Sequence, residues 1–336
     1  MGDISYMKIA IVKLSAMGDI IHAMVALQFI KKALPDAKID WIVEEGFKGI
    51  LENNPHIDTI LPVNLKSIKK NKSEIVIQYK LLKEYAKNNY DVVIDAQGLL
   101  KSAIVSRIIG GRVVGSFVAG FDIDSIREKI ASIFYDKKVY ISYSQNVIER
   151  SLKVICEPLG LKVTKEDILA KEPFLFSKSN LENLNYKIIF VVGASKPNKI
   201  YPKEKFLEVA ERLKEEILVV WGNEEEYETA LWLSENSNFI TLDSKGTLDD
   251  LKSKIQNASL VIGGDTGPSH IAWGMNIPSI TIFGNTPAYR NTYETDINKI
   301  VKSSSTVNPL KLNKNDFSIN EIDSNEIVAI ARKLLK

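Results

Sequence analysis

Short apolar stretches alternate along the chain with longer stretches in which apolar residues recur every three to four positions. The short stretches are rich in valine and isoleucine and apolar on both faces, which is typical of strands in a parallel sheet covered by helices. They predict ten strands, at residues 8–14, 39–44, 59–64, 91–97, 112–116, 187–195, 216–222, 239–244, 260–265 and 279–284. Most of the stretches between them predict helices. The pattern therefore indicates an α/β chain built on parallel sheets.

The alternation is interrupted near residues 165–186, where the chain is polar and mixed. A chain of 336 residues is longer than a domain with a single hydrophobic core usually is. We therefore expect two domains. They are doubly wound, Rossmann-like units at residues 7–165 and 187–318, joined by a linker over residues 166–186. Residues 319–336 have helical periodicity and are expected to form a C-terminal helix that packs on either domain. Residues 1–6 add nothing to the first strand and suggest an upstream start or a tag remnant.

The amino-acid composition argues against several classes of protein. Lys and Arg number 44 against 42 for Asp and Glu, and this net charge of +2 gives no reason to expect nucleic acid. A single cysteine, Cys156, excludes an intrachain disulfide and a cysteine-based metal cluster, which fits a reducing cytosol. No apolar run approaches the roughly 20 residues of a membrane span, and no signal peptide is recognisable. We therefore expect a cytoplasmic protein.

Two parallel sheets that face each other form a cleft lined by strand ends and helix N-termini, where such folds bind ligands. The first such loop, "KLSAMGDIIH", places Asp19 at the junction of a strand and a helix. Asp19 is either an N-cap or a carboxylate that acts as a general base. His22, one turn further, is expected to be a packed residue rather than a catalyst.

Two loops of the second half carry charges that suit a nucleotide. Ser195 and Lys199 follow a strand with small residues, and a lysine there can bind phosphate, although a solvated loop is the simpler interpretation. Residues 224–226 are three glutamates after the next strand. An acid at this place can hold ribose hydroxyls, but three acids also suit an exposed first helical turn.

The stretch "GGDTGPSH" at residues 263–270 is a glycine turn between a strand and a helix. Pro268 suits the first helical turn, where its missing N–H costs nothing. Thr266, Gly267 and Ser269 would direct backbone N–H groups at an anion, and His270 lies on the same open end. A diphosphate accounts for both the glycines and the histidine.

These motifs resemble those of the bacterial lipopolysaccharide heptosyltransferases over nearly the whole chain, most closely the heptosyltransferase I branch, which adds the first heptose to the inner core. The matching motifs are Gly18-Asp19 with His22, "IDAQGLLKSA" (94–103), "SIREKIASIFYDKKV" (125–139) and "GDTGPSHIA" (264–272). The third separates branch I from the rest of the family. Four motifs in family order are a specific signal.

The resemblance implies a GT-B architecture, with an N-terminal acceptor domain and a C-terminal donor domain. It implies transfer of heptose from ADP-heptose to Kdo-lipid A, with Asp19 as the general base. The implied donor-binding residues are Ser195, Lys199, Glu224, Asp265, Thr266, Gly267 and His270. Glu225 or Glu226 could replace Glu224, because the acid run is shorter than is usual in the family.

The acceptor is an anionic lipid, so the N-terminal domain should be locally basic. The resemblance implies Arg127 as an acceptor contact. Lysines at strand ends are further candidates, namely Lys66, Lys69, Lys70, Lys72 and Lys101. An anionic leaflet attracts such clusters, which predicts peripheral association with the cytoplasmic face of the inner membrane. A solvated lysine-rich loop is as good an explanation for any single lysine.

The expected chemistry is a single inverting displacement without a metal or other cofactor, in which Asp19 takes the proton of the acceptor hydroxyl. The "DID" at residues 122–124 resembles a metal-binding pattern but is too short to be specific. A dehydrogenase also has two αβ domains, but hydride transfer is not expected, because no G-x-G-x-x-G follows a strand. A heptosyltransferase that acts later in the core, or a non-catalytic nucleotide-sugar-binding protein, remains an alternative. We expect a monomer.

Overall fold

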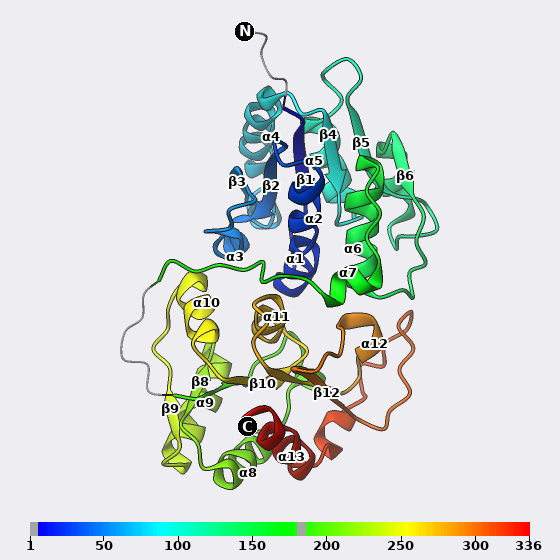
Figure 1. Cartoon of the computed structure of the whole chain (residues 1–336). Helices are drawn as coiled ribbons and strands as arrows, with labels where there is room; N and C mark the ends of the chain where they lie inside the picture. Colours follow the sequence, from blue (N-terminus) through cyan, green and yellow to red (C-terminus); the bar gives the residue numbers. More distant parts are fainter. Residues whose placement is uncertain (1–5, 180–185) are drawn as a thin grey trace. The chain divides into compact units, whose positions relative to one another are not determined.

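The computed structural model of the chain describes residues 6–179 and 186–336 and divides into two compact units, Met1–Phe174 and Leu175–Lys336. The division falls inside the segment 166–186, where a linker was expected. Each unit holds one six-stranded parallel sheet with helices around it (Figure 1). Of the six N-terminal residues with no predicted role, residues 1–5 lie outside the described part of the chain.

The sheet of the N-terminal unit has the strand order β3-β2-β1-β4-β5-β6. Its strands are β1 (Lys8–Val12), β2 (Lys38–Glu44), β3 (Thr59–Val63), β4 (Val92–Asp95), β5 (Phe117–Phe121) and β6 (Lys137–Val139). Its helices are α1 (Met17–Met24), α2 (Ala26–Ala33), α3 (Lys48–Leu51), α4 (Glu74–Tyr85), α5 (Leu100–Ile109), α6 (Val147–Cys156) and α7 (Lys165–Leu169). The central strands β1 and β4 are buried almost throughout. Their sequences are almost continuously apolar because helices cover both faces of the sheet.

The sheet of the C-terminal unit has the order β12-β11-β10-β7-β8-β9. Its strands are β7 (Ile188–Val191), β8 (Ile217–Val220), β9 (Ile240–Leu242), β10 (Leu260–Gly264), β11 (Ser279–Phe283) and β12 (Asn298–Lys302). Its helices are α8 (Lys203–Leu213), α9 (Glu224–Asn236), α10 (Leu248–Gln256), α11 (Gly267–Gly274), α12 (Ala288–Asn291) and α13 (Ser324–Leu334). In both sheets the chain starts in the middle and turns back, so the strand order reverses there. Ligands of such folds bind beyond the carboxyl ends of the strands at this point.

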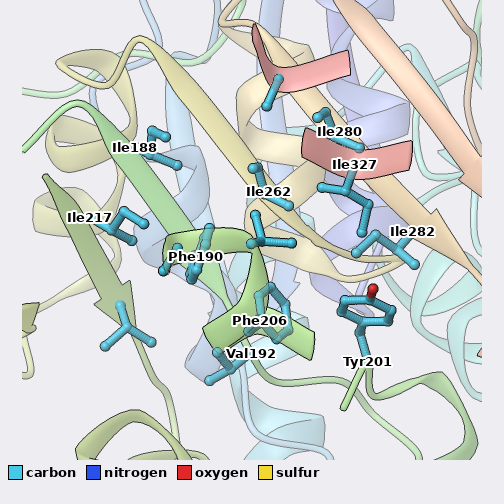
Figure 2. Close-up of a cluster of buried hydrophobic side chains, with 14 of the residues drawn as sticks. Ile188, Phe190, Val192, Tyr201, Phe206, Ile217, Ile262, Ile280, Ile282 and Ile327 are labelled. Carbon is cyan, nitrogen blue, oxygen red and sulfur yellow. The ribbon is translucent and has the colours of Figure 1, made fainter. Parts of the chain in front are cut away.

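The core of the C-terminal unit joins the sheet to helices α8 and α13. Figure 2 shows Phe190 of β7 and Phe206 of α8 among isoleucines from neighbouring strands, with Ile327 of α13 in the same cluster. The rings of Phe190 and Phe206 lie 5.0 Å apart between centroids. Helix α13 therefore packs within the C-terminal unit, and the C-terminal helix expected at residues 319–336 is present over Ser324–Leu334.

One predicted strand is wrong, so that β5 was missed, and two further strands, β6 and β12, had no predicted counterpart. Residues 112–116 form a turn, in which Ser116 Oγ donates to the carbonyl of Val113 at 2.6 Å and Val114 is fully exposed. The strand follows at Phe117–Phe121. The unpredicted strands, β6 and β12, are short edge strands with exposed lysines at their ends, and edge strands are commonly protected by lysine. Their apolar pattern is therefore too weak to detect.

Candidate active site

Asp265 is the centre of a hydrogen-bond cluster in the C-terminal unit. It lies between β10 and α11, and its side chain is only 6% exposed. Its Oδ2 atom accepts hydrogen bonds from Lys199 Nζ at 2.7 Å, Thr286 Oγ1 at 3.0 Å and Asn291 Nδ2 at 3.0 Å. Its Oδ1 atom lies 3.2 Å from Nε2 of His270. The histidine of the glycine-rich turn is therefore bound to the aspartate of the same turn.

The partners of Asp265 keep its carboxylate ionised. Burial alone would raise the pKa of Asp265, but the hydrogen bond with His270 and the charge of Lys199 outweigh burial and hold the pKa well below its ordinary value. A buried carboxylate with several donors also fixes the side chains that donate to it. Asp265 thus orients Lys199 and His270 at the carboxyl end of β10.

Lys199 reaches this position from a 3₁₀ turn, η6 (Pro197–Lys199), after β7. Its ammonium donates to the Asp265 carbonyl at 3.1 Å as well as to the carboxylate. A Cβ on Gly264 would lie 3.0 Å from the Lys199 carbonyl oxygen, so a glycine at the end of β10 permits this close approach. Because an ammonium has three N–H donors, one remains for a ligand.

Helix α11 begins at Gly267, as the glycine turn predicted. Thr266 is its N-cap, with an extended backbone and no side-chain cap bond, and Pro268 lies in the first turn. Ser269 is used internally, because its hydroxyl donates to the Gly264 carbonyl at 2.8 Å. The first N–H groups of an eight-residue helix and the ammonium of Lys199 therefore meet beside Asp265, which is the arrangement that binds phosphate.

The other predicted donor residues lie outside this cluster. Ser195 is exposed in the loop after β7, and Glu224 and Glu225 are exposed in the first turn of α9. Glu226 is different. Its carboxylate accepts from the Gly222 N–H at 2.7 Å and occupies the space that a side chain on Gly193 would need. Of the three glutamates, Glu226 alone is held at the end of β7.

The sequence analysis missed two members of the cluster, Thr286 and Asn291. They come from the loop and short helix after β11, in "GNTPAYRN". A signal was present, because polar residues directly follow a predicted buried strand, as they do at Asp265. Such residues gather at one edge of a parallel sheet.

In the N-terminal unit, Asp19 is exposed at the third position of α1. The N-cap is Ala16, whose N–H donates to Asp19 Oδ2 at 3.3 Å. The interpretation of Asp19 as the N-cap residue itself is therefore wrong, although its carboxylate does satisfy one backbone donor at the helix start. His22 is buried, as expected of a packed residue.

Two buried ionisable residues of the N-terminal unit, Lys13 and Asp95, were not predicted. Lys13 follows β1, is 7% exposed and donates to the Ala96 carbonyl at 2.9 Å. Burial lowers the pKa of Lys13, while the charges of Asp19 and Asp95 oppose that shift. Asp95 ends β4 and accepts from the Tyr135 hydroxyl at 2.7 Å. A buried cation is thus close enough to Asp19 to interact with its charge.

Of the predicted acceptor residues, Arg127 and Lys101 belong to neighbouring segments. Both are exposed. Glu128, next to Arg127, accepts the N–H of Leu100 at 2.7 Å, and this bond joins the Arg127 segment to the first turn of α5, which carries Lys101. The ammonium of Lys101 lies 3.9 Å from Oε1 of Glu44 at the end of β2.

The remaining predicted cations are exposed in and around a 3₁₀ turn, η2 (Ser67–Lys69), after β3; they are Lys66, Lys69, Lys70 and Lys72. Lys66 lies over the ring of Phe47, 4.9 Å from its centroid. They form a segment separate from that of Arg127 and Lys101. The structure therefore groups the six candidates into two sets.

The "DID" segment has structural partners. Asp122 accepts the N–H of Ser125 at 2.9 Å, and Asp124 lies 3.9 Å from the ammonium of Lys129. In residues 6–179 and 186–336, no three His, Cys, Asp or Glu side chains are grouped closely enough to hold a metal ion. Nor does any helix in those ranges combine the length and apolar character that a membrane span requires.

Comparison with known proteins gives the family. The sequence profile of glycosyltransferase family 9 (heptosyltransferase) matches residues 78–316. Lipopolysaccharide heptosyltransferase 1 of Campylobacter coli is 39% identical, with 98% of this chain and 99% of the relative aligned. Its counterpart from Escherichia coli K12 is 32% identical over 83% of this chain and 88% of the relative.

A solved structure, E. coli heptosyltransferase WaaC with ADP, is similar at a TM-score of 0.81 and 26% identity, covering 98% of this chain and all of WaaC. A second structure of that protein, with ADP-2-deoxy-2-fluoro heptose, gives a TM-score of 0.79 at the same identity, with 97% and 99% covered. The two parallel sheets and these neighbours confirm the GT-B type of fold. This chain belongs to glycosyltransferase family 9, the heptosyltransferases, and is a glycosyltransferase.

Proposed function

We propose that this enzyme is a lipopolysaccharide heptosyltransferase I, which transfers L-glycero-D-manno-heptose from ADP-heptose to a Kdo residue of Kdo-lipid A. Relatives of that name align with most or nearly all of the chain. The observation that carries the proposal is the cluster around Asp265, which holds a lysine beside a helix N-terminus. That arrangement fits the diphosphate of a nucleotide sugar.

On the donor side, Lys199 and the N–H groups of Thr266 and Gly267 bind the diphosphate. Asp265 was expected to contact the donor, but its buried carboxylate already has four partners. We therefore assign it the role of orienting Lys199 and His270 toward the donor. As ADP leaves, charge grows on the diphosphate, and Lys199 stabilises that charge in the transition state.

For the ribose of the donor, the geometry favours Glu226 over Glu224 and Glu225. Its carboxylate is fixed by Gly222 beside the end of β7, whereas the other two are exposed. Each oxygen of a carboxylate can accept more than one hydrogen bond. Glu226 can therefore still accept hydrogen bonds from ribose hydroxyls. Ser195, exposed in the preceding loop, contributes a hydroxyl to the diphosphate.

The catalytic base is Asp19. It is exposed in the first turn of α1, so an acceptor hydroxyl can reach it. The hydroxyl oxygen attacks the anomeric carbon, the bond from that carbon to ADP breaks, and the hydroxyl proton passes to Asp19. One displacement inverts the anomeric centre. No step requires a metal or other cofactor, and the enzyme acts as a monomer.

On the acceptor side, Arg127 and Lys101 bind the carboxylate of Kdo, and Lys66, Lys69 and Lys70 attract the anionic lipid. The first turn of α4 follows these lysines and exposes more than half of each of three aliphatic side chains, Ile75, Val76 and Ile77. Apolar side chains next to lysines suit the surface of an anionic bilayer. These features support peripheral contact with the cytoplasmic leaflet of the inner membrane.

The test compares two acceptors in the presence of ADP-heptose. Kdo-lipid A without heptose should be converted, with stoichiometric release of ADP, and the same lipid already carrying one heptose should not. Conversion of the second lipid alone would identify a heptosyltransferase that acts later in the core. Tight binding of ADP-heptose without ADP release in either reaction would identify a nucleotide-sugar-binding protein.

A further inference from the structure

Glu44 is a buried carboxylate that lacks a hydrogen bond where one is needed. It is the last residue of β2, and its side chain is 3% exposed. In the described part of the chain, its Oε1 atom is closed to solvent and has no hydrogen-bond partner. The nearest cation, Lys101 Nζ, is 3.9 Å away, which is too far for a hydrogen bond.

The other buried carboxylates of the described N-terminal unit, Asp40 and Asp95, each accept at least two hydrogen bonds. Asp40, on the same strand, accepts from the Tyr90 hydroxyl at 2.6 Å and from Asn88 Nδ2 at 3.1 Å. Asp95 accepts from the Tyr135 hydroxyl at 2.7 Å and from two backbone N–H groups. Buried polar atoms are nearly always satisfied, and an exception calls for an explanation. Among the buried carboxylates of the described N-terminal unit, Glu44 is such an exception.

The place of Glu44 in the fold indicates where its missing donor comes from. Strands β1 and β2 are neighbours, and the N–H of Glu44 donates to the Leu14 carbonyl at 3.2 Å. Glu44 therefore lies beside the start of the loop that leads to Asp19. Lys101, its distant partner, is 42% exposed in the first turn of α5. Both neighbours belong to the acceptor side of the proposed reaction.

We propose that Glu44 accepts a hydrogen bond from a hydroxyl group of the acceptor sugar and thereby helps to determine which sugar is accepted. The inference rests on the proposed function of the N-terminal unit. The ammonium of Lys101 makes no hydrogen bond in the described residues, so its long side chain can move aside for a hydroxyl. Its positive charge then offsets the burial of the carboxylate. A hydrogen bond to a charged group is stronger than one between neutral groups, so its presence or absence can discriminate between sugars.

The experiment uses the full-length enzyme and a set of deoxy acceptors, each lacking one hydroxyl of the Kdo sugar. In the wild type, removal of the hydroxyl that meets Glu44 should lower kcat/KM by about 10–100-fold. Glu44→Gln keeps the shape and loses the charge, so the same deoxy acceptor should be penalised only about threefold, because a neutral hydrogen bond is weaker. The KM for ADP-heptose should not change in this variant.

The matched control is Asp40→Asn, on the same strand but with its partners inside the protein. It should lower the thermal stability and leave the discrimination among acceptors as in the wild type. Equal penalties in wild type and Glu44→Gln for every deoxy acceptor would overturn the inference. So would a Lys101→Met variant that abolishes the discrimination while Glu44→Gln retains it, since Lys101 would then be the contact.

The design separates this inference from the proposed function. If the wild type releases no ADP with the complete Kdo acceptor, the proposed function is wrong. If the wild type turns over that acceptor but Glu44→Gln discriminates as the wild type does, the inference on Glu44 alone is wrong. Thermal unfolding of Glu44→Gln shows whether the variant is folded before its kinetics are compared.

Discussion

The ammonium of Lys199 lies 2.7 Å from the carboxylate of Asp265, and their side chains are 15% and 6% exposed. This pair joins the loop after β7 to the start of α11. The carboxylate of Asp265 therefore orients the ammonium of Lys199 toward the N-terminus of that helix. Removing either partner leaves the other charge buried and unpaired, which is costly. The pair therefore gives the most direct tests of the donor site.

Lys199→Ala should lower kcat/KM for ADP-heptose by about 10²–10³, because the charge that stabilises the leaving diphosphate is lost. Steady-state kinetics with varied ADP-heptose measure the effect. Lys196→Ala, three residues earlier and exposed, is the matched control and should lose less than about threefold in kcat/KM. Equal effects of the two substitutions would contradict the assigned role of Lys199.

Asp265 should make stability depend on pH in a defined direction. Its folded-state pKa lies well below that of the unfolded chain, so its stabilising effect is complete above the unfolded pKa of about 4 and is lost as the pH falls further. Compared with Asp265→Asn, the wild type should have a larger free energy of unfolding that stays constant above about pH 5 and shrinks below about pH 4. Urea denaturation between pH 3 and pH 7 measures this difference.

Asp95 supplies the contrasting case for the same experiment. Burial raises its pKa above the ordinary value, against the hydrogen bond from Tyr135. Its contribution to stability is therefore largest below the unfolded pKa and is lost as the pH rises through the folded pKa. The stability difference between wild type and Asp95→Asn should have a pH slope of opposite sign. A shared slope for both aspartates would refute the two assignments.

Asp19→Asn should reduce turnover by about 10²–10⁴, the usual contribution of a general base. The amide oxygen can still accept the Ala16 N–H, so thermal stability and the affinity for ADP-heptose should be close to those of the wild type. Turnover, the melting temperature and ADP-heptose binding are measured on the same preparation. If the variant keeps most of its turnover, Asp19 has only its capping role in α1.

Arg127→Lys should raise the KM for the Kdo acceptor about tenfold, because lysine keeps the charge but loses the two parallel bonds of a guanidinium to a carboxylate. The KM for ADP-heptose should not change. Lys69→Gln and Lys70→Gln should instead weaken acceptor binding mainly at low salt, since exposed charges are screened over about 8 Å at physiological ionic strength. Wild-type acceptor kinetics of Arg127→Lys at every salt concentration would place the Kdo carboxylate elsewhere.

Chelators should leave the rate of transfer unchanged. Asp122 and Asp124, the candidate metal ligands of the N-terminal unit, are engaged with Ser125 and Lys129, and the proposed displacement uses only protein groups. The rate is measured after treatment with EDTA and again after magnesium or manganese is added. Loss of activity on chelation followed by recovery with a divalent ion would establish a metal-dependent mechanism.

The strands that the sequence predicted well are the buried central ones, such as Lys8–Val12 and Leu260–Gly264, where helices on both faces require continuous apolar residues. The strand Phe117–Phe121 was missed for a packing reason. A Cβ on Gly120 would meet the ring of Tyr135, so the glycine that interrupts the strand pattern also leaves room for the tyrosine that bonds Asp95. Local propensity cannot reveal a requirement of this kind.

At the candidate site, sequence patterns located Asp265, His270 and Lys199 because they flank glycines and strand ends. They could not show that these three residues meet, since the distance between Lys199 and Asp265 along the chain is 66 residues. Glu44 was overlooked for the opposite reason. It sits at the end of an apolar strand, and only the structure shows that its carboxylate is buried without a donor.

The close contact of Glu226 with Gly193 links the evolution of two loops. Any side chain at position 193 would occupy the space of the Glu226 carboxylate, so a change at one position constrains the other. A side chain at position 193 is compatible with the fold if position 226 has already lost its acid. Otherwise the side chain displaces the Glu226 carboxylate, which would weaken the proposed contact with the nucleotide. Among the heptosyltransferases, the pair should therefore vary together, and attempts to redesign the nucleotide preference should alter both positions at once.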